Sequence, residues 1–175
     1  MTIHVKELNP EEYRGKKLDI KYSTPGYYDV QIGMLSFTLK YVSFGEPREV
    51  SYSDVIGAHW LQNPVLYGAF DGDKIIGFIE MYEETQNNRL RIQNLIVHPD
   101  YRGKGIGGDL VNASKYVAAQ RKNRMVVLQT QSCNINAIKR YRKSGFELVG
   151  IDTCSNSNED IENHNVRLEY GYRIK

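Results

Sequence analysis

In the stretch Leu90-Arg-Ile-Gln-Asn-Leu-Ile-Val97, apolar residues at 90, 92 and 95–97 predict a β-strand that becomes more buried toward its end. The strand runs directly into a glycine-rich loop, His98-Pro-Asp-Tyr-Arg-Gly-Lys-Gly-Ile-Gly107. Apolar and small residues then recur at helical spacing over residues 108–122. The sequence therefore predicts a buried strand that leads through this loop into the N-terminus of a helix.

The end of the loop has the chemistry of an anion site. The first backbone N–H groups of a helix lack partners, and the positive end of the helix dipole lies beside them. Glycine lets a ligand approach the main chain closely, and the loop adds one arginine and one lysine. We therefore predict that a phosphate-bearing cofactor is held by Arg102, Gly103, Lys104, Gly105, Ile106 and Gly107.

Two nucleotide-binding motifs and one simpler structure are the alternatives for this loop. The glycines at 103, 105 and 108 match a dinucleotide fingerprint, but that motif needs a βαβ unit and an acidic residue about 20 positions later. The next strand ends instead in Leu128-Gln-Thr-Gln131. A P-loop is excluded, because no Gly-Lys-Ser/Thr follows at the required spacing. The simpler structure is a glycine-rich turn with two solvated cations.

The segments on either side complete an α/β pattern with a mixed sheet and helices packed on it. Asp71-Gly72-Asp73 predicts a hairpin turn between two strands. Gly145 predicts the end of the second helix. Residues 1–63 show a less regular pattern, and residues 152–164 are expected to form a surface loop. The expected elements are strands at 65–70, 74–81, 90–97, 125–128, 146–151 and 166–172, and helices at 108–122 and 134–144.

Length and charge limit the functional classes. The 175 residues suit one domain, and 23 Lys and Arg against 21 Asp and Glu give a net charge of +2. A domain that binds nucleic acid through phosphates usually has a pI above roughly 9, so no nucleic-acid partner is expected. No apolar run approaches the ~20 residues of a membrane span, and no secretory signal is evident. The two cysteines, Cys133 and Cys154, are too few for a disulfide framework and lack the spacing of metal ligands. We therefore expect reduced thiols in a cytoplasmic protein, and no metal site.

A second motif follows the loop, Asn134-Ile-Asn-Ala-Ile-Lys-Arg-Tyr-Arg-Lys-Ser-Gly-Phe146. With the loop after a strand ending in Ile96-Val97, this order of motifs resembles the GNAT superfamily of N-acetyltransferases. The resemblance covers residues 64–151. Within the superfamily the chain is similar to streptothricin acetyltransferases, which place strings like Leu128-Gln-Thr-Gln131 and Gly145-Phe146 at these points.

The resemblance implies a GNAT fold, in which a splayed central mixed sheet is flanked by helices and acetyl-CoA enters the gap. It implies one domain over residues 1–175, with an acceptor-binding arm at 1–63, a cofactor-binding core at 64–151 and a C-terminal strand and loop at 152–175. The loop would hold the pyrophosphate, and Lys143 lies in a basic segment expected near the phosphates. The pantetheine arm would be bound by Leu95, Ile96, Val97 and Asn134.

The resemblance also supplies a candidate general acid, Tyr141. When an amine attacks the thioester, a CoA thiolate leaves, and a nearby hydroxyl can protonate it. The alternative is that Tyr141 is a core residue, since it follows Ile138 at helical spacing.

A general base is harder to assign. Where the streptothricin enzymes carry acidic residues, this chain has Gln93, Asn94 and Gln129, and amides cannot accept a proton at neutral pH. Glu80 on the preceding strand is the best remaining candidate, with Glu83 behind it. Two alternatives stay open: Glu80 is a solvated or ion-paired strand residue, or water takes the proton.

The acceptor is expected near Gln93 and Asn94. A further hypothesis is an aromatic wall around the acceptor, formed by Tyr27, Tyr28, Phe37, Tyr41 and Trp60. Of these residues, Tyr28 and Trp60 are predicted to contact the acceptor. The alternative is that these aromatic side chains pack in the core or at a hinge. His59 and His98 are expected to be ordinary surface histidines.

With this resemblance, we expect a cytoplasmic enzyme that transfers an acetyl group from acetyl-CoA to a primary amine of a small molecule. Attack would be direct in a ternary complex, because no Cys or Ser occupies a nucleophile setting. An aminated antibiotic such as streptothricin is a candidate acceptor, so antibiotic resistance is a hypothesis to test. A protein N-terminus or lysine, a non-catalytic acyl-CoA-binding module and a homodimer stay open.

Overall fold

The computed structural model describes residues 3–175, which form two compact units. Among the described residues, the first unit contains residues 3–20, Ser53–Leu128 and Tyr172–Lys175, and the second contains Lys21–Tyr52 and Gln129–Gly171. The expected acceptor-binding arm, residues 1–63, is therefore divided between the two units. The single domain expected over residues 1–175 stays a prediction.

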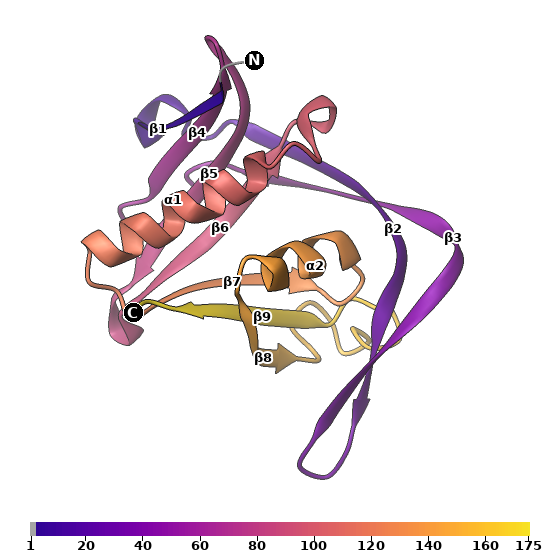
Figure 1. The fold of residues 1–175 in the computed structure, drawn as a ribbon. Coiled ribbons are helices and arrows are strands. Elements are labelled where there is room, and N and C mark those ends of the chain that lie inside the picture. The colour runs from indigo at the N-terminus through magenta and orange to yellow at the C-terminus, as the bar shows by residue number, and fades with distance from the viewer. Residues whose placement is uncertain (1–2) are drawn as a thin grey trace. The chain divides into compact units, whose positions relative to one another are not determined.

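The first unit is built on a mixed sheet (Figure 1). Its strands are β1 (Ile3–Leu8), β4 (Val65–Asp71), β5 (Lys74–Glu84), β6 (Arg89–Val97) and the first part of β7 (Met125–Gln131). Neighbours pair antiparallel from β1 through β4 and β5 to β6, and β6 then pairs with β7 in parallel. The hairpin predicted at Asp71-Gly72-Asp73 is confirmed, and Gly72 takes a φ of +59° in its turn.

Helix α1 (Ile106–Gln120) packs against β4, β5 and β6, as Figure 1 shows. It begins two residues before the expected start, directly after Gly105. Its buried residues recur at helical spacing and form one apolar face. Leu110, Val111 and Ala118 are fully buried on that face. The strand–loop–helix unit predicted from the sequence is therefore present.

Pairing between β6 and β7 is short. Within the first unit it joins Arg89, Leu90 and Arg91 to Met125, Val126 and Val127. Strand β6 continues to Val97 while it stays paired with β5 on its other edge. Within the first unit, β6 therefore separates from its parallel neighbour β7 after Arg91. The splayed sheet implied by the GNAT resemblance has such a separation.

The second unit contains helix α2 (Ile135–Lys143) and an antiparallel pair of strands, β8 (Glu147–Asp152) and β9 (Arg167–Arg173). It also contains most of a long two-stranded sheet made by β2 (Lys17–Ile32) and β3 (Phe37–Val55). Three 3₁₀ turns complete the described elements, namely η1 (Pro10–Glu12), η2 (Thr85–Asn87) and η3 (Pro99–Tyr101).

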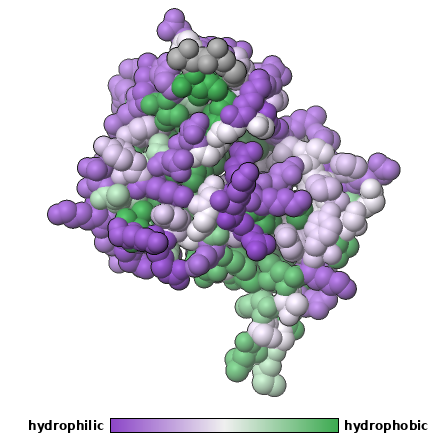
Figure 2. Space-filling model, viewed as in Figure 1, coloured by the Kyte–Doolittle hydropathy of each residue, from purple (hydrophilic) through white to green (hydrophobic). Residues whose placement is uncertain are grey.

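The expectation that the N-terminal third is less regular is wrong, because β2 and β3 occupy much of it. Most of β3 is exposed, so burial imposes no alternation of apolar and polar residues on its sequence. The turn between the two strands exposes Met34 and Leu35 almost completely, and Figure 2 shows apolar surface at the end of this hairpin.

The expected surface loop at 152–164 is confirmed beyond Asp152, which ends β8. It is organised around Asp160, which is buried and accepts hydrogen bonds from the backbone N–H groups of Asn156 and Ser157. These bonds hold the pKa of Asp160 below its usual range despite its burial. Among residues 3–175, no helix is long and apolar enough to cross a membrane.

Candidate active site

The glycine-rich loop connects the end of β6 to the start of α1 in the first unit. The Arg102 guanidinium donates from Nε to the carbonyl oxygen of Val97 at 3.2 Å, which ties the loop to the strand. The Lys104 ammonium lies 4.9 Å from the centre of the Tyr101 ring, a cation–π distance. Both predicted cations are therefore positioned by contacts with neighbouring residues.

Two glycines turn the loop into α1. Gly103 and Gly105 have φ values of +80° and +88°, in the left-handed region that favours glycine. Among the described residues, and apart from the glycine itself and its two neighbours in sequence, no atom lies within 4 Å of where a Cβ at either position would be. Gly105 precedes Ile106, the first residue of α1, and the first N–H groups of a helix have no partner within it. The loop thus presents backbone donors beside open space, which suits a phosphate group.

The end of β6 is paired on one edge. Leu95, Ile96 and Val97 lie opposite Ile79, Phe78 and Gly77 of β5. In the first unit, the pairing with β7 does not extend beyond Arg91. The main chain of residues 95–97 can therefore form a ladder with a peptide-like ligand along its other edge.

A β-bulge separates the two amides that were expected to face the acceptor. Glu80 lies opposite Asn94 and Met81 lies opposite Ile92, so Gln93 is the extra residue on β6. A bulge re-aims the side chains beside it. Asn94 is buried and donates from Nδ2 to Oε2 of Glu80 at 2.8 Å, whereas Gln93 is half-buried.

Glu80 is enclosed by the protein, with only 1% of its surface exposed. Its Oε1 accepts a 2.6 Å hydrogen bond from the backbone N–H of Gly57, and its Oε2 accepts the one from Asn94. Burial raises the pKa of Glu80, while these two hydrogen bonds oppose the rise. The alternative of a solvated Glu80 is therefore wrong, and its role as the base stays a prediction.

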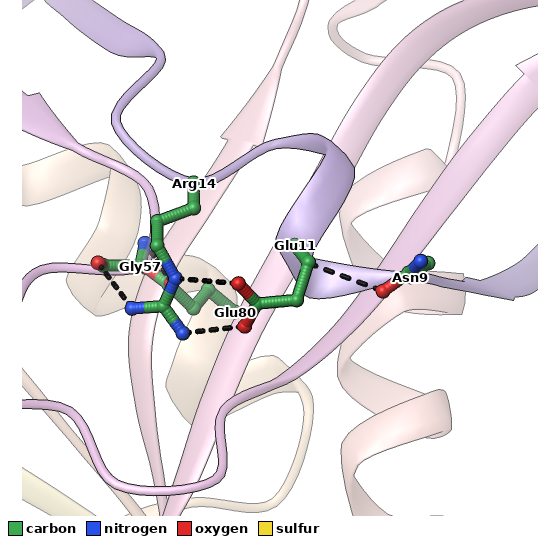
Figure 3. Close-up of polar contacts among 5 residues, drawn as sticks. All are labelled: Asn9, Glu11, Arg14, Gly57 and Glu80. Carbon is green, nitrogen blue, oxygen red and sulfur yellow. Dashed lines mark hydrogen bonds and ion pairs between the residues drawn. The ribbon is translucent and has the colours of Figure 1, made fainter.

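Arg14 completes this cluster (Figure 3). Its Nη1 donates to the carbonyl oxygen of Gly57 at 3.1 Å. Its Nε and Nη2 donate to the two carboxylate oxygens of Glu11 at 2.9 and 2.6 Å. Gly57 is thus bonded at its N–H by Glu80 and at its carbonyl by Arg14.

Two more predicted residues lie in the first unit. The Trp60 side chain is about half exposed, and its ring stands edge-on to Tyr82 with centroids 5.7 Å apart. Glu83 is half-buried, pairs with Arg121 at 3.7 Å and accepts a hydrogen bond from Asn123. Glu83 is thus occupied by an ion pair and a hydrogen bond of its own. The structure therefore does not favour Glu83 as a second candidate base behind Glu80.

In the second unit, α2 carries three predicted residues. Asn134 caps the helix, with its side-chain oxygen accepting from the N–H of Ala137 at 3.2 Å. Tyr141 packs between Phe146 and Tyr170, with ring centroids 6.3 and 6.2 Å away. Burial raises the pKa of Tyr141 to about 12. Lys143 is exposed in the last turn, where a cation also complements the helix dipole.

The expected aromatic wall is only partly formed within the second unit. Tyr28 contacts Tyr41 edge-on, with centroids 6.1 Å apart. Tyr27 instead stacks on His164 at 3.6 Å and contacts Phe44. Tyr27 therefore takes the packing role that was its alternative, and the role of Tyr28 as an acceptor contact stays a prediction.

Comparison with known proteins decides the family. Residues 34–146 match the model of the Acetyltransferase (GNAT) family. The chain belongs to this family. It is therefore an N-acetyltransferase, and the family uses acetyl-CoA.

Relatives and solved structures support the same conclusion. A streptothricin acetyltransferase of Escherichia coli is 32% identical over 125 residues, which cover 71% of this chain and 70% of the relative. One from Streptomyces lavendulae is 30% identical over 147 residues, covering 78% and 77%. A Bacillus anthracis protein assigned as a streptothricin acetyltransferase was solved with acetyl coenzyme A. It shares the fold, with a TM-score of 0.76 and 23% identity over 100% of this chain and 99% of that one.

Two features of the first unit agree with the use of acetyl-CoA by the GNAT family. The loop offers backbone donors and cations beside open space, and the end of β6 offers one unpaired edge of its ladder in the first unit. Among residues 3–175, no group of three His, Cys, Asp or Glu side chains could hold a metal ion. The individual cofactor contacts stay predictions.

The local chemistry accounts for an amide at position 94 of this GNAT chain. An amide N–H can donate to the buried Glu80 carboxylate, but a carboxylate at the same place could not. Asn94→Asp should therefore lower the free energy of unfolding at pH 7 by about 2–4 kcal/mol, because two carboxyl groups would share one buried site. The loss should shrink as the pH falls, because the raised pKa of Glu80 favours folding when that group is protonated.

Urea unfolding at pH 4.5 and pH 7 measures this effect. Gln93→Glu is the matched control, since it adds the same charge at the adjoining, half-buried bulge residue. An equal loss in the two variants, or a loss independent of pH, would contradict the pairing of Asn94 with Glu80.

Arg14 and Gly57 are contacts of the cluster that sequence analysis missed. Arg14 lies 43 residues from Gly57, and no spacing rule connects them. The positive φ of Gly57, +63°, is a backbone property that a single glycine in the sequence does not reveal.

Proposed function

We propose that this GNAT enzyme is cytoplasmic and transfers the acetyl group of acetyl-CoA to a primary amine of a small molecule, by direct attack in a ternary complex. The observation that carries the proposal is the loop at the start of α1, where Gly103 and Gly105 leave open space beside backbone donors. It directly follows a strand whose pairing with β7 stops at Arg91. The streptothricin acetyltransferases among the relatives make an aminated antibiotic the first acceptor to test.

The loop and strand would bind the cofactor in two parts. The pyrophosphate would lie at the N-terminus of α1 with Arg102 and Lys104, and the pantetheine arm would pair with residues 95–97. Asn134 would contact the pantetheine end and Lys143 a phosphate, as the family motif implies. Acetyl-CoA supplies an acetyl group already activated as a thioester.

Tyr141 is the proposed general acid. In the reaction a C–N bond forms, the C–S bond breaks, and the departing sulfur takes a proton from the phenol. Because burial raises the pKa of Tyr141 to about 12, the phenol keeps its proton at neutral pH. The amine gives up two protons overall, one of which restores the phenol and one of which is released.

The route of the amine proton is assigned to water rather than to direct contact with Glu80. Glu80 as a residue is 1% exposed, and each oxygen of its carboxylate already accepts a hydrogen bond. A relay through water needs no dedicated base, and Gln93 and Asn94 then only position the acceptor. The alternative, Glu80 as the base, predicts an acidic limb in the pH–rate profile that Glu80→Gln would abolish.

Direct attack is supported by the state of the buried cysteine. Cys133 is 9% exposed, and burial raises the pKa of its thiol. Its Sγ lies 3.7 Å from the Tyr22 hydroxyl. A raised pKa lowers the thiolate fraction, so Cys133 is a poor nucleophile for an acetyl-enzyme intermediate.

A combined binding and turnover experiment tests the proposal. Acetyl-CoA binding is measured by titration calorimetry, and thiol release is followed with streptothricins, aminoglycosides, polyamines and peptides. We expect binding together with turnover on a small amine. Binding without turnover on any amine would favour a non-catalytic acyl-CoA-binding module, and turnover only on peptides would favour a protein acetyltransferase.

A further inference from the structure

The segment after β3 forms a short turn that is anchored at both ends. Ile56 and Leu61 are 3% and 5% exposed, so both are buried in the first unit. The backbone N–H of Leu61 donates to the carbonyl oxygen of Ala58 at 2.9 Å. Between the two anchors, the Trp60 side chain is 51% exposed. The turn therefore presents a tryptophan to solvent from a fixed base.

The peptide groups at the start of this turn are held from two directions. The carbonyl oxygen of Gly57 accepts a hydrogen bond from Arg14 (Figure 3). The backbone N–H of Gly57 donates to the Glu80 carboxylate. Ile56 is restrained as well. Its carbonyl oxygen accepts from the backbone N–H of Gly15 at 2.8 Å, and its own N–H donates to the carbonyl oxygen of Lys16 at 3.0 Å. Four hydrogen bonds thus restrain two consecutive residues.

Glycine is required at position 57. Its φ of +63° is strained for other residues, and a Cβ there would lie 3.2–3.4 Å from atoms of Arg14. The Arg14 side chain therefore packs directly on the glycine whose carbonyl it binds. We call Arg14, Gly57 and Glu80 the Gly57 clamp.

Both side chains of the clamp are themselves fixed. Glu11 binds the Arg14 guanidinium through two hydrogen bonds, the planar geometry that arginine favours. Asn94 binds the second oxygen of Glu80. A clamp with restrained components restricts the turn more than two freely rotating side chains could.

We propose that the Gly57 clamp positions Trp60 to bind the acceptor as a cation, through the face of its indole ring. Arg14 and Glu80 are then positioning residues for acceptor recognition. An ammonium ion over an indole face is a favourable cation–π pair, and primary amines are ammonium ions at neutral pH. The inference rests on the proposed function, because it assigns the acceptor contact of that same reaction.

The chain contains a single tryptophan, so its fluorescence reports on the clamp without any activity assay. In Arg14→Ala, we expect acrylamide to quench Trp60 more strongly than in the wild type. The KM for the acceptor should rise about tenfold, the value of one hydrogen bond to a charged group, while the KM for acetyl-CoA stays unchanged. Arg14→Lys should lie between the two, because lysine cannot reproduce the planar contact with Glu11.

Arg121→Ala is the matched control. The Arg121 side chain is 36% exposed and pairs with Glu83, whereas that of Arg14 is 40% exposed and pairs with Glu11. Both substitutions remove an arginine from a half-exposed ion pair in the first unit. Only Arg14→Ala should change Trp60 quenching and the acceptor KM.

A reciprocal exchange tests the other arm of the clamp. In Glu80→Gln, with the Asn94 amide oriented as in this structure, the new amide N–H would face the amide N–H of Asn94, two donors without an acceptor. Adding Asn94→Asp restores an acceptor there, while the oxygen of the amide introduced at position 80 can still accept from Gly57. We therefore expect Glu80→Gln to loosen Trp60 and raise the acceptor KM about tenfold, and the double variant to recover the Trp60 quenching of the wild type.

The outcomes separate the clamp from the proposed function. Unchanged quenching in both Arg14→Ala and Glu80→Gln would overturn the clamp, and changed quenching with an unchanged acceptor KM would overturn its role in acceptor binding. A Glu80→Gln enzyme with an unchanged KM but a lost acidic limb in its pH–rate profile would make Glu80 the base instead. Absence of turnover in the wild type with every amine would overturn the proposed function and the acceptor role, whereas the quenching result would still decide the clamp.

Discussion

Replacing Tyr141 with phenylalanine is expected to lower kcat by about 100- to 1,000-fold and to leave acetyl-CoA affinity unchanged. The substitution removes one hydroxyl and keeps the ring that packs between Phe146 and Tyr170. The fold should therefore survive, and the loss should appear in the step that protonates the leaving sulfur. Steady-state kinetics and calorimetric titration with acetyl-CoA measure the two quantities.

Tyr170→Phe is the matched control for this prediction. Tyr170 is a buried tyrosine of the same unit, it contacts Tyr141, and burial likewise raises its pKa. It should lose little activity, because no acid role is assigned to it. Equal activity of Tyr141→Phe and the wild type would remove Tyr141 from the mechanism and leave it as a core residue.

The pH dependence of the wild type provides a second check on Tyr141. A general acid must be protonated to act, so its contribution is lost as the pH rises through its pKa. With a pKa raised to about 12, Tyr141 should impose no alkaline limb on kcat at any pH where the protein is ordinarily assayed. An alkaline limb near pH 8 that disappears in Tyr141→Phe would contradict the raised pKa.

The sequence predicted the elements whose burial leaves a periodic pattern. Strand β6 and helix α1 are buried on defined faces, and their apolar spacing located both to within two residues. The glycines between them were informative because the positive φ values of Gly103 and Gly105 exclude most other residues. Local pattern and local backbone geometry agree at this point of the chain.

The long strands β2 and β3 could not be predicted in the same way. Strand β3 buries little surface, so no face of it has to be apolar, and pairing is made by backbone groups that any sequence carries. The turn between the two strands also exposes Met34 and Leu35, whereas exposed turns are usually polar. Missing burial, rather than unusual chemistry, made this region look irregular.

The cluster around Glu80 shows a different limit. The sequence identified Glu80 as a titratable group on the correct strand, but its partners depend on a bulge and on residues far away in the chain. The bulge at Gln93 brings Asn94 opposite Glu80, and the tertiary fold brings Gly57 to its other oxygen. Whether a carboxylate is free or occupied is decided by such long-range contacts, which a single sequence does not display.

Gly105→Val is expected to weaken acetyl-CoA binding by at least about 100-fold, equivalent to two lost hydrogen bonds from backbone donors to a charged phosphate. The valine Cβ would occupy the open space beside the first N–H groups of α1, where the pyrophosphate is proposed to bind. The φ of +88° would also strain a β-branched residue, lowering the free energy of unfolding by about 1–3 kcal/mol. Calorimetric titration and urea unfolding separate the two effects.

Gly72→Val distinguishes a blocked site from a strained backbone. Gly72 also has a positive φ, +59°, and among the described residues outside its two neighbours in sequence no atom lies within 4 Å of where a Cβ would be. It lies in the turn between β4 and β5, so valine there should cost similar stability and leave acetyl-CoA affinity intact. If Gly105→Val is destabilised to the same degree as Gly72→Val yet binds acetyl-CoA normally, the phosphate does not bind at the start of α1. If both variants lose affinity together, strain acting through the sheet, rather than obstruction of the loop, accounts for the loss.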